Sequence, residues 1–293
     1  MSNEQMIIAE RSRDIGNFLV GRLLPFRKKR MVGPFIFIDH MGPSSYGPDK
    51  YMDIDQHPHI GLSTLTYLFE GEIEHRDSIG TKQIIRPGDV NWMTAGRGVT
   101  HTERTPEAIR TSGKHGQLHG YQIWVALPKE KEDISPAFQH LEKARLQTWE
   151  EDGLHFSLIA GEAFGKRSAL NVHSPMFLLD LRSANAQELC LDGQLKGEVG
   201  ICVVRGSVMS ADQTVGEGEL LVSKAEDQCS LWVNEDSHLL IFGGEGFPEE
   251  RHIDWNFVSS SKEKLITARE DWKAKRFPLV EGDESYIPHP KDS

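Results

Sequence analysis

The amino-acid sequence predicts an all-β protein with two barrel or sandwich domains and a C-terminal helix. Short runs rich in β-branched and aromatic residues recur along the chain, and glycine and proline interrupt them at close intervals. A run with convincing helical spacing occurs only late in the sequence. Because 293 residues exceed the usual size of a single hydrophobic core, we expect two domains rather than one.

Six runs are expected to contain the main strands. They are residues 33–41, 63–75, 82–93, 121–128, 200–210 and 229–233. The expected helix lies within residues 260–277, after a serine-rich segment that suits an N-cap. Its apolar residues at roughly helical spacing are Leu265, Ile266, Ala268, Trp272 and Phe277.

The stretch PKEKEDISP, residues 128–136, is predicted to link two folded units because it is charged and bracketed by prolines. We therefore expect an N-terminal domain of residues 1–132. The C-terminal domain is then expected to comprise residues 133–293 and to include the helix.

Each half of the chain contains a similar order of strand, tight turn, strand, loop, turn and strand. The turns fall at Gly71 and Gly88 in the first half and at Gly206 and Gly218 in the second. The spacings of the two pairs differ by five residues (88 − 71 = 17 and 218 − 206 = 12), so the similarity is weak evidence for a tandem repeat.

Charge and cysteine content limit the partners and the compartment. Lysine and arginine total 33 against 44 aspartate and glutamate residues, a formal net charge of -11, so we expect direct binding to neither nucleic acid nor membrane. The cysteines Cys190, Cys202 and Cys229 form no CxxC motif, which argues against a disulfide framework. The N-terminus lacks the pattern of a signal peptide, and no apolar run reaches membrane-spanning length. We expect a cytoplasmic protein, or a nuclear one if the source is eukaryotic.

Two short motifs contain candidate metal ligands. His57 and His59 are two residues apart, as are His101 and Glu103, so the members of each pair point to the same face of an extended strand. Three imidazoles and a carboxylate suit a divalent iron, manganese, nickel, copper or zinc ion and leave coordination positions open. An isolated H-x-H is more often a pair of polar residues on a surface loop. Spacing alone therefore leaves both interpretations open.

The sequence around these motifs closely resembles the pirin family of the cupin superfamily. The resemblance lies in HPHIGLSTLTYLFEGEIEHRDSIG and RPGDVNWMTAGRGVTHTE, with further similar blocks at residues 22–43 and 119–128. Residues 255–278 resemble the C-terminal part of many bacterial members, whereas residues 243–255 depart from the usual proline-containing loop. The resemblance implies a bicupin, in which two jelly-roll-like β-barrels form one chain and the N-terminal barrel holds one mononuclear iron.

The resemblance also implies which residues bind the metal. The family's ligands fall on His57, His59, His101 and Glu103, each of the expected type. In the second half, the corresponding positions fall near Asp192 and Gln194 and near Leu231 and Val233, and no histidine occurs from residue 174 to 237. The second barrel is therefore expected to hold no comparable metal.

Other polar and aromatic residues are expected to have structural roles. His75, His115 and His119 are interpreted as surface or hydrogen-bonding histidines, and Asp39 and His40 as residues that could orient a ligand imidazole. The aromatic and apolar residues near the motifs are interpreted as barrel core. They are Trp92, Met93, Tyr121 and Trp124.

Bacterial pirins are similar to quercetin 2,3-dioxygenases, which implies oxidative opening of the central ring of a flavonol with release of carbon monoxide. The expected cofactor is one Fe(II) ion, with Mn, Ni, Cu or Zn as alternatives, and the expected partners are a flavonol or other phenolic and dioxygen. Glu103 is the candidate base for the flavonol 3-hydroxyl. The alternative is an iron-dependent, redox-sensitive regulator that binds a transcription factor or enzyme without catalysis. We expect a monomer in either case.

Overall fold

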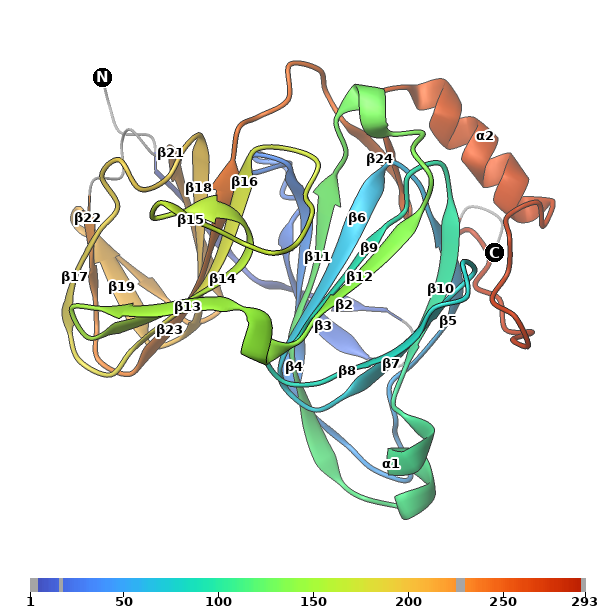
Figure 1. Cartoon of the computed structure of the whole chain (residues 1–293), viewed down its shortest axis with the longest axis horizontal. Helices are drawn as coiled ribbons and strands as arrows, with labels where there is room; N and C mark the ends of the chain where they lie inside the picture. The colour runs from blue at the N-terminus through green and yellow to red at the C-terminus, as the bar shows by residue number, and fades with distance from the viewer. Residues whose placement is uncertain (1–4, 16–17, 225–229, 291–293) are drawn as a thin grey trace. The chain divides into compact units, whose positions relative to one another are not determined.

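A computed structural model describes residues 5–15, 18–224 and 230–290 (Figure 1). The chain divides into two compact units, each assembled from segments that are not contiguous in sequence. The N-terminal barrel comprises residues 12–20, 39–143 and 248–293. The C-terminal barrel comprises residues 1–11, 21–38 and 144–247. Both units are built from β-sheets, which confirms the predicted all-β class with two cupin-type domains.

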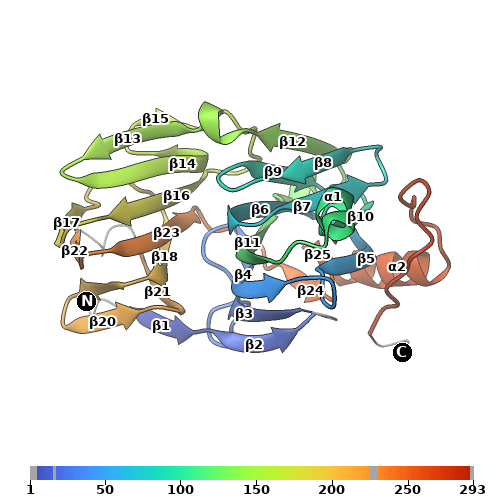
Figure 2. The same cartoon turned by 90° about the horizontal axis from the view of Figure 1, so that it is seen from below.

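The strands β2 to β12 form a seven-stranded and a four-stranded sheet (Figure 2). The larger has the order β12 (Ala137–Leu141), β9 (Val90–Thr94), β6 (Leu62–Glu70), β11 (Gly116–Ala126), β4 (Phe35–Tyr46), β3 (Leu19–Leu24) and β2 (Arg11–Asp14). The smaller has the order β5 (Asp53–His59), β10 (Val99–Arg104), β7 (Ile73–Asp77) and β8 (Lys82–Ile85).

The C-terminal barrel also contains a large and a small antiparallel sheet. The large sheet has the order β1 (Met6–Ala9), β21 (Glu219–Lys224), β18 (Glu198–Arg205), β23 (Ser237–Gly244), β16 (Met176–Ser183), β14 (Leu154–Ala163) and β13 (Gln147–Glu151), with β15 (Lys166–Arg167) paired to β14. The small sheet has the order β17 (Gln187–Cys190), β22 (Ser230–Val233), β19 (Ser207–Ser210) and β20 (Gln213–Gly216). Leucine, isoleucine, valine and phenylalanine side chains fill its core.

The two barrels repeat one strand order, as the paired glycine turns suggest. Strands β6 to β9 and strands β18 to β21 follow the same sequence of turns and pairings. Ile73 pairs with Ile85 in one barrel, and Val208 pairs with Val215 in the other. Ile73 and Val208 each lie two residues after a turn glycine with positive φ. Ile85 and Val215 each lie three residues before one. Those glycines are Gly71 (83°), Gly88 (86°), Gly206 (78°) and Gly218 (76°).

The predicted helix is α2, Lys262–Lys273, which packs against β25 (Phe257–Ser259) in the N-terminal barrel. The hydroxyl of Ser261 accepts a hydrogen bond from the backbone N–H of Lys264 and caps its first turn. Leu265, Ala268 and Trp272 are buried, whereas Ile266 is 54% exposed and does not belong to the apolar face. A second, short helix, α1, occupies Glu107–Ser112. Within the described residues, no helix is long and apolar enough to cross a membrane.

The observed division differs from the expected boundary between residues 132 and 133. The N-terminal barrel continues to Lys143 and also includes residues 248–293 with α2. The charged stretch 128–136 is no linker, because the buried carboxylate of Glu132 accepts hydrogen bonds from the Ser259 hydroxyl (2.7 Å) and the Ser260 backbone N–H (2.7 Å). The next strand, β12, then pairs with β9 in the larger sheet of the N-terminal barrel.

The cysteines that the structure describes are free thiols. Cys190 is exposed, and Cys202 is buried, which raises the pKa of its thiol. Cys229 lies outside the described residues, as does the first residue of the strand predicted at 229–233.

Candidate metal centre

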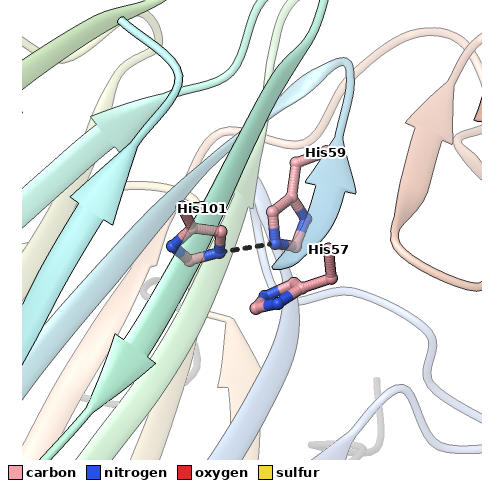
Figure 3. A group of neighbouring side chains, drawn as sticks. All are labelled: His57, His59 and His101. Atoms are coloured by element: carbon pink, nitrogen blue, oxygen red, sulfur yellow. Dashed lines mark hydrogen bonds between the residues drawn. The ribbon is translucent and has the colours of Figure 1, made fainter. Parts of the chain in front are cut away.

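The four predicted ligands lie on two neighbouring strands of the N-terminal barrel. Strands β5 and β10 are antiparallel, with His101 opposite His57 and Val99 opposite His59. The register shifts between the pairs His101–His57 and Glu103–Ile54, because Asp55 and Gln56 of β5 lie opposite the single residue Thr102 of β10. All four candidate side chains are buried, and Figure 3 shows the three imidazoles turned toward one another.

Two of the three imidazoles are anchored through Nδ1. His57 Nδ1 lies 2.8 Å from the backbone oxygen of Asp55, and His59 Nδ1 lies 3.2 Å from the backbone oxygen of Asn256. A carbonyl oxygen only accepts, so each Nδ1 carries the proton and each Nε2 keeps a free lone pair. This is the tautomer that binds metal through Nε2.

The distances among the imidazoles fit a shared cation. His59 Nε2 and His101 Nε2 are 3.1 Å apart, and ligand atoms of His57, His59 and His101 all lie within 4.8 Å of one another. Adjacent ligands at about 2.1 Å from one six-coordinate ion would be roughly 3.0 Å apart. Since His59 carries its proton on Nδ1, a hydrogen bond between the two Nε2 atoms would require the proton on His101. A cation between them suits both lone pairs.

Burial keeps these imidazoles neutral. It lowers the pKa of His57 to about 4 and lowers the pKa values of His59 and His101 well below the usual value, and neighbouring histidines add to the effect. Neutral imidazole is the form that binds a metal ion, so no proton has to leave these groups at pH 7.

Glu103 lies near His101 and His75. Its carboxylate groups with His75 and His101, with ligand atoms within 4.8 Å of one another, rather than appearing in the group with His57 and His59. The Thr66 hydroxyl lies 3.2 Å from Glu103 Oε1 and 2.9 Å from Gln122 Oε1 and can donate to either. Burial raises the pKa of the Glu103 carboxyl, although His75 and the Thr66 hydroxyl partly offset this effect.

His75 is an interior residue that the motif analysis left outside the candidate site. It is 3% exposed, its Nε2 lies 3.1 Å from Asp77 Oδ2, and its Nδ1 lies 3.3 Å from His101 Nδ1. His75 is thus a hydrogen-bonding histidine, and it also belongs to a group of potential ligands with His101 and Glu103. The sequence did contain a sign that His75 is an interior residue. Side chains alternate between the two faces of a strand, so His75 lies on the same face as the apolar Ile73 and as Asp77.

Most of the other candidates are buried or half-buried. His40 Nε2 lies 2.9 Å from His119 Nε2, and His115 is exposed. Asp39 is buried. The ring of Trp124 contacts that of His59 edge-on, with centroids 5.1 Å apart. The residues interpreted as core are all buried, namely Trp92, Met93, Tyr121 and Trp124.

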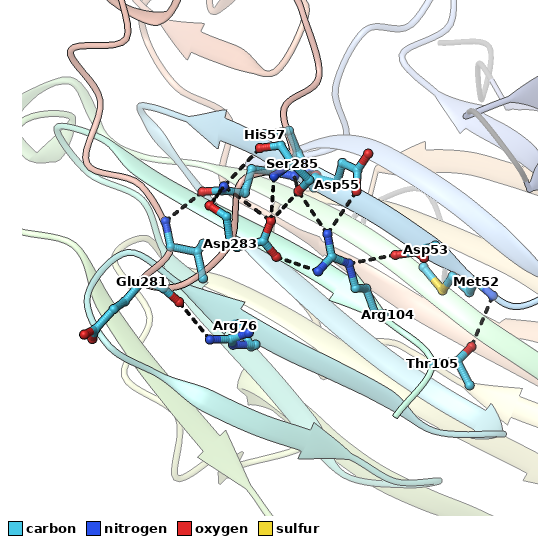
Figure 4. A network of polar contacts seen from close by, with 12 residues as sticks. Met52, Asp53, Asp55, His57, Arg76, Arg104, Thr105, Glu281, Asp283 and Ser285 are labelled. Atoms are coloured by element: carbon cyan, nitrogen blue, oxygen red, sulfur yellow. Dashed lines mark hydrogen bonds and ion pairs between the residues drawn. The ribbon is translucent and has the colours of Figure 1, made fainter. Parts of the chain in front are cut away.

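The C-terminal segment holds the strand that carries His57 and His59 (Figure 4). The buried Gln56 side chain donates to the backbone oxygens of Asp283 (2.8 Å) and Ser285 (3.0 Å) and accepts from the Val280 N–H (2.7 Å). The Arg104 guanidinium, on β10, forms an ion pair with Asp283. Residues 280–287 therefore fix β5 directly beside His57, a contact that local sequence patterns could not reveal.

Two barrels of this topology, one with a histidine-rich interior, define a bicupin. The chain matches the family model described as Pirin over residues 17–125 and the model described as Pirin C-terminal cupin domain over residues 178–278. A pirin-like protein from Caulobacter vibrioides is 45% identical over 290 residues, which cover 98% of this chain and 99% of the relative. The chain belongs to the pirin family.

Other similar proteins have names that state an enzymatic activity. A Pseudomonas aeruginosa protein whose name gives quercetin 2,3-dioxygenase as a candidate activity is 36% identical over 92% of this chain and 83% of its own length. The crystal structure of a quercetin 2,3-dioxygenase from Acinetobacter baumannii matches with a TM-score of 0.89 at 33% identity. That match covers 98% of this chain and 95% of the other.

Proposed function

We propose that the N-terminal barrel binds one divalent metal ion and that the protein opens the central ring of a flavonol with release of carbon monoxide. The proposed ligands are His57, His59, His101 and Glu103, and the proposed native ion is Fe(II). The single observation that carries the proposal is the convergence of three buried, neutral imidazoles whose ligand atoms lie within 4.8 Å of one another. The names of relatives that share at least a third of their residues with this chain support the choice of substrate.

A bound metal ion would act as a Lewis acid that lowers the pKa of the flavonol 3-hydroxyl, and its open coordination positions suit an oxyanion and dioxygen. The carboxylate of Glu103 takes the proton of that hydroxyl. Its burial keeps bulk water from competing for the proton. The Thr66 hydroxyl, 3.2 Å from Glu103 Oε1, can donate to this carboxylate.

Anaerobic purification, metal analysis and an oxygen-electrode assay with quercetin test both parts of the proposal. We expect about one first-row metal ion per chain, and oxygen uptake and carbon monoxide release that depend on quercetin. His59→Ala is expected to lose metal and uptake together, because the buried Nε2 ligand is gone. His155→Ala is the matched control, since His155 is a largely exposed histidine in the C-terminal barrel.

Each part can fail separately. Wild-type protein that binds no ion would refute the metal site, and metal-loaded protein without quercetin-dependent oxygen uptake would refute the flavonol dioxygenase. In the second case, partner capture that differs between the ferrous and ferric forms would favour the regulatory role. A protein partner and the monomeric state stay predictions.

A further inference from the structure

A buried hydrogen-bonded chain leads from a carboxylate to the candidate ligand His101. Asp77 Oδ2 lies 3.1 Å from His75 Nε2, and His75 Nδ1 lies 3.3 Å from His101 Nδ1. All three side chains are at most 3% exposed. The His75 ring also stacks on Phe138, with centroids 4.7 Å apart and planes 27° apart, so its orientation is held from the side as well.

The direction of each hydrogen bond in this chain follows from the carboxylate. An ionised carboxylate only accepts, so His75 carries its proton on Nε2 and presents a lone pair at Nδ1. His101 must then donate from its own Nδ1, which leaves the lone pair of His101 on Nε2. That atom is the one that lies 3.1 Å from His59 Nε2.

We infer that Asp77 and His75 set the tautomer of His101, so that its Nε2 lone pair faces the candidate metal position. In this role both are positioning residues. His57 and His59 obtain the same tautomer from backbone oxygens, whereas His101 obtains it from side chains. The inference rests on the proposed metal site, although the tautomer itself exists without a metal.

The same geometry separates His75 from the ligands. His75 groups with His101 and Glu103 in one cluster of potential ligand atoms. Its Nε2 is engaged by Asp77, and its Nδ1 faces the Nδ1 side of the His101 ring rather than the Nε2 side. One imidazole cannot direct both nitrogens at one ion, so the ion bound by His101 Nε2 lies away from His75.

Asp77→Asn is the decisive variant. Asp77 Oδ1 accepts the backbone N–H groups of Ile79 (3.1 Å) and Thr81 (2.9 Å), so an asparagine keeps its oxygen there and turns its NH₂ group toward His75 Nε2. His75 must then protonate on Nδ1 and donate to His101 Nδ1. His101 would carry its proton on Nε2, where it blocks the metal position.

The tautomers are measured in metal-free protein by long-range ¹H–¹⁵N NMR of labelled histidine. We expect His101 to carry its proton on Nδ1 in the wild type and on Nε2 in Asp77→Asn. Zn(II) affinity, measured by competition with a chromophoric chelator, is expected to fall about 10- to 100-fold in the variant. An unchanged His101 tautomer in Asp77→Asn would overturn the inference.

Asp89→Asn is the matched control. Asp89 is also a buried aspartate that accepts backbone hydrogen bonds, from Arg86 and Lys143, and it lies 3.8 Å from a histidine, His140. We expect it to leave the His101 tautomer and the Zn(II) affinity unchanged. A similar loss of affinity in both variants would assign the effect to lost structural support and contradict the inference.

A double-mutant cycle tests whether Asp77 acts through His75. His75→Phe removes the relay and keeps a ring against Phe138, so adding Asp77→Asn to it should cause no further loss of Zn(II) affinity. An equal loss in both backgrounds would contradict the relay. If wild-type protein shows the expected tautomers but does not consume quercetin, the inference stands and the proposed activity fails. If His75→Phe does not fold, the NMR measurement on Asp77→Asn still decides.

Discussion

The two barrels share one order of strands and turns but differ in the chemistry of one part of their interiors. In the C-terminal barrel, Leu231 of β22 pairs with Leu189 of β17, and both are buried in an apolar cluster. On the equivalent pair of strands in the N-terminal barrel, Glu103 of β10 pairs with Ile54 of β5. One framework therefore accommodates either a hydrophobic core or a polar site.

The difference shows what a polar interior requires. Each buried leucine contributes roughly 1.5–3 kcal/mol through removal from water, whereas a buried polar group is unfavourable unless it is hydrogen-bonded. Every polar residue of the candidate centre has such a partner. The pairs are His57 with Asp55, His59 with Asn256, His101 with His75, His75 with Asp77, and Glu103 with Thr66. A metal site in this fold thus depends on side chains and backbone that surround the ligands.

Making the N-terminal interior resemble the C-terminal one should have the largest effect. His101→Leu removes a central Nε2 ligand and places an apolar side chain at a fully buried position. Loss of a ligand's hydrogen-bond partner lowers metal affinity roughly 10- to 100-fold. We expect loss of the ligand itself to lower the affinity further, while the protein stays folded. Metal analysis with urea unfolding measures both. Stoichiometric metal in this variant would contradict the assignment of His101.

Glu103→Gln keeps the shape of the site and removes the base. We expect quercetin turnover to fall by roughly 10² to 10⁴, the usual contribution of a positioned acid or base, while much of the metal stays bound. Oxygen uptake normalised to bound metal is the measurement. Undiminished uptake would exclude Glu103 as the base and leave the metal site intact.

Creating a cavity in the C-terminal barrel should affect only stability. Leu231→Ala is expected to lower the free energy of unfolding by about 2–5 kcal/mol, because it removes buried methyl groups and leaves a cavity. Metal content is expected to stay at the wild-type level. Urea unfolding and metal analysis test this pair of outcomes, and a loss of metal at unchanged stability would contradict the separate roles of the two interiors.

The polar interior should also make the metal-free protein sensitive to acid. The pKa of His57 is about 4 in the folded protein and about 6.5 when exposed, so between these values the unfolded chain binds the proton and the folded chain does not. His57 therefore destabilises the fold progressively as pH falls from 6.5 to 4, by up to about 3 kcal/mol.

Comparison with His57→Leu separates the loss of stability due to His57 from the loss due to protonation of carboxylates, which both proteins share. Urea unfolding at pH 7.5, 6 and 5 should show that the wild type loses more stability than the variant as the pH falls. Parallel pH profiles for the two metal-free proteins would be inconsistent with a buried, neutral His57.

Short-range patterns predicted the elements that carry the site. Alternation along a strand predicted that His57 and His59 share one face, and β5 and β10 bring them together with His101, whereas Glu103 groups with His101 and His75. Glycine turns likewise indicated the repeated strand order, because positive φ is accessible to glycine at low cost. These features depend on residues close in sequence.

The contacts that organise the ligands could not be predicted in this way. Asn256, which orients His59, is 197 residues away in sequence. The charged stretch 128–136 looked like a linker because its composition does not reveal that Ser259 and Ser260 bind the carboxylate of Glu132. Long-range hydrogen bonds of this kind determined both the domain division and the anchoring of the centre.

Anomalous X-ray diffraction at the metal absorption edge, from crystals of the Fe(II)-loaded protein, tests the central claim most directly. The account predicts one anomalous peak per chain, in the N-terminal barrel, at bonding distance from Nε2 of His57, His59 and His101 and from a carboxylate oxygen of Glu103. A peak in the C-terminal barrel, or a peak bound by His75 in place of His57 and His59, would contradict it.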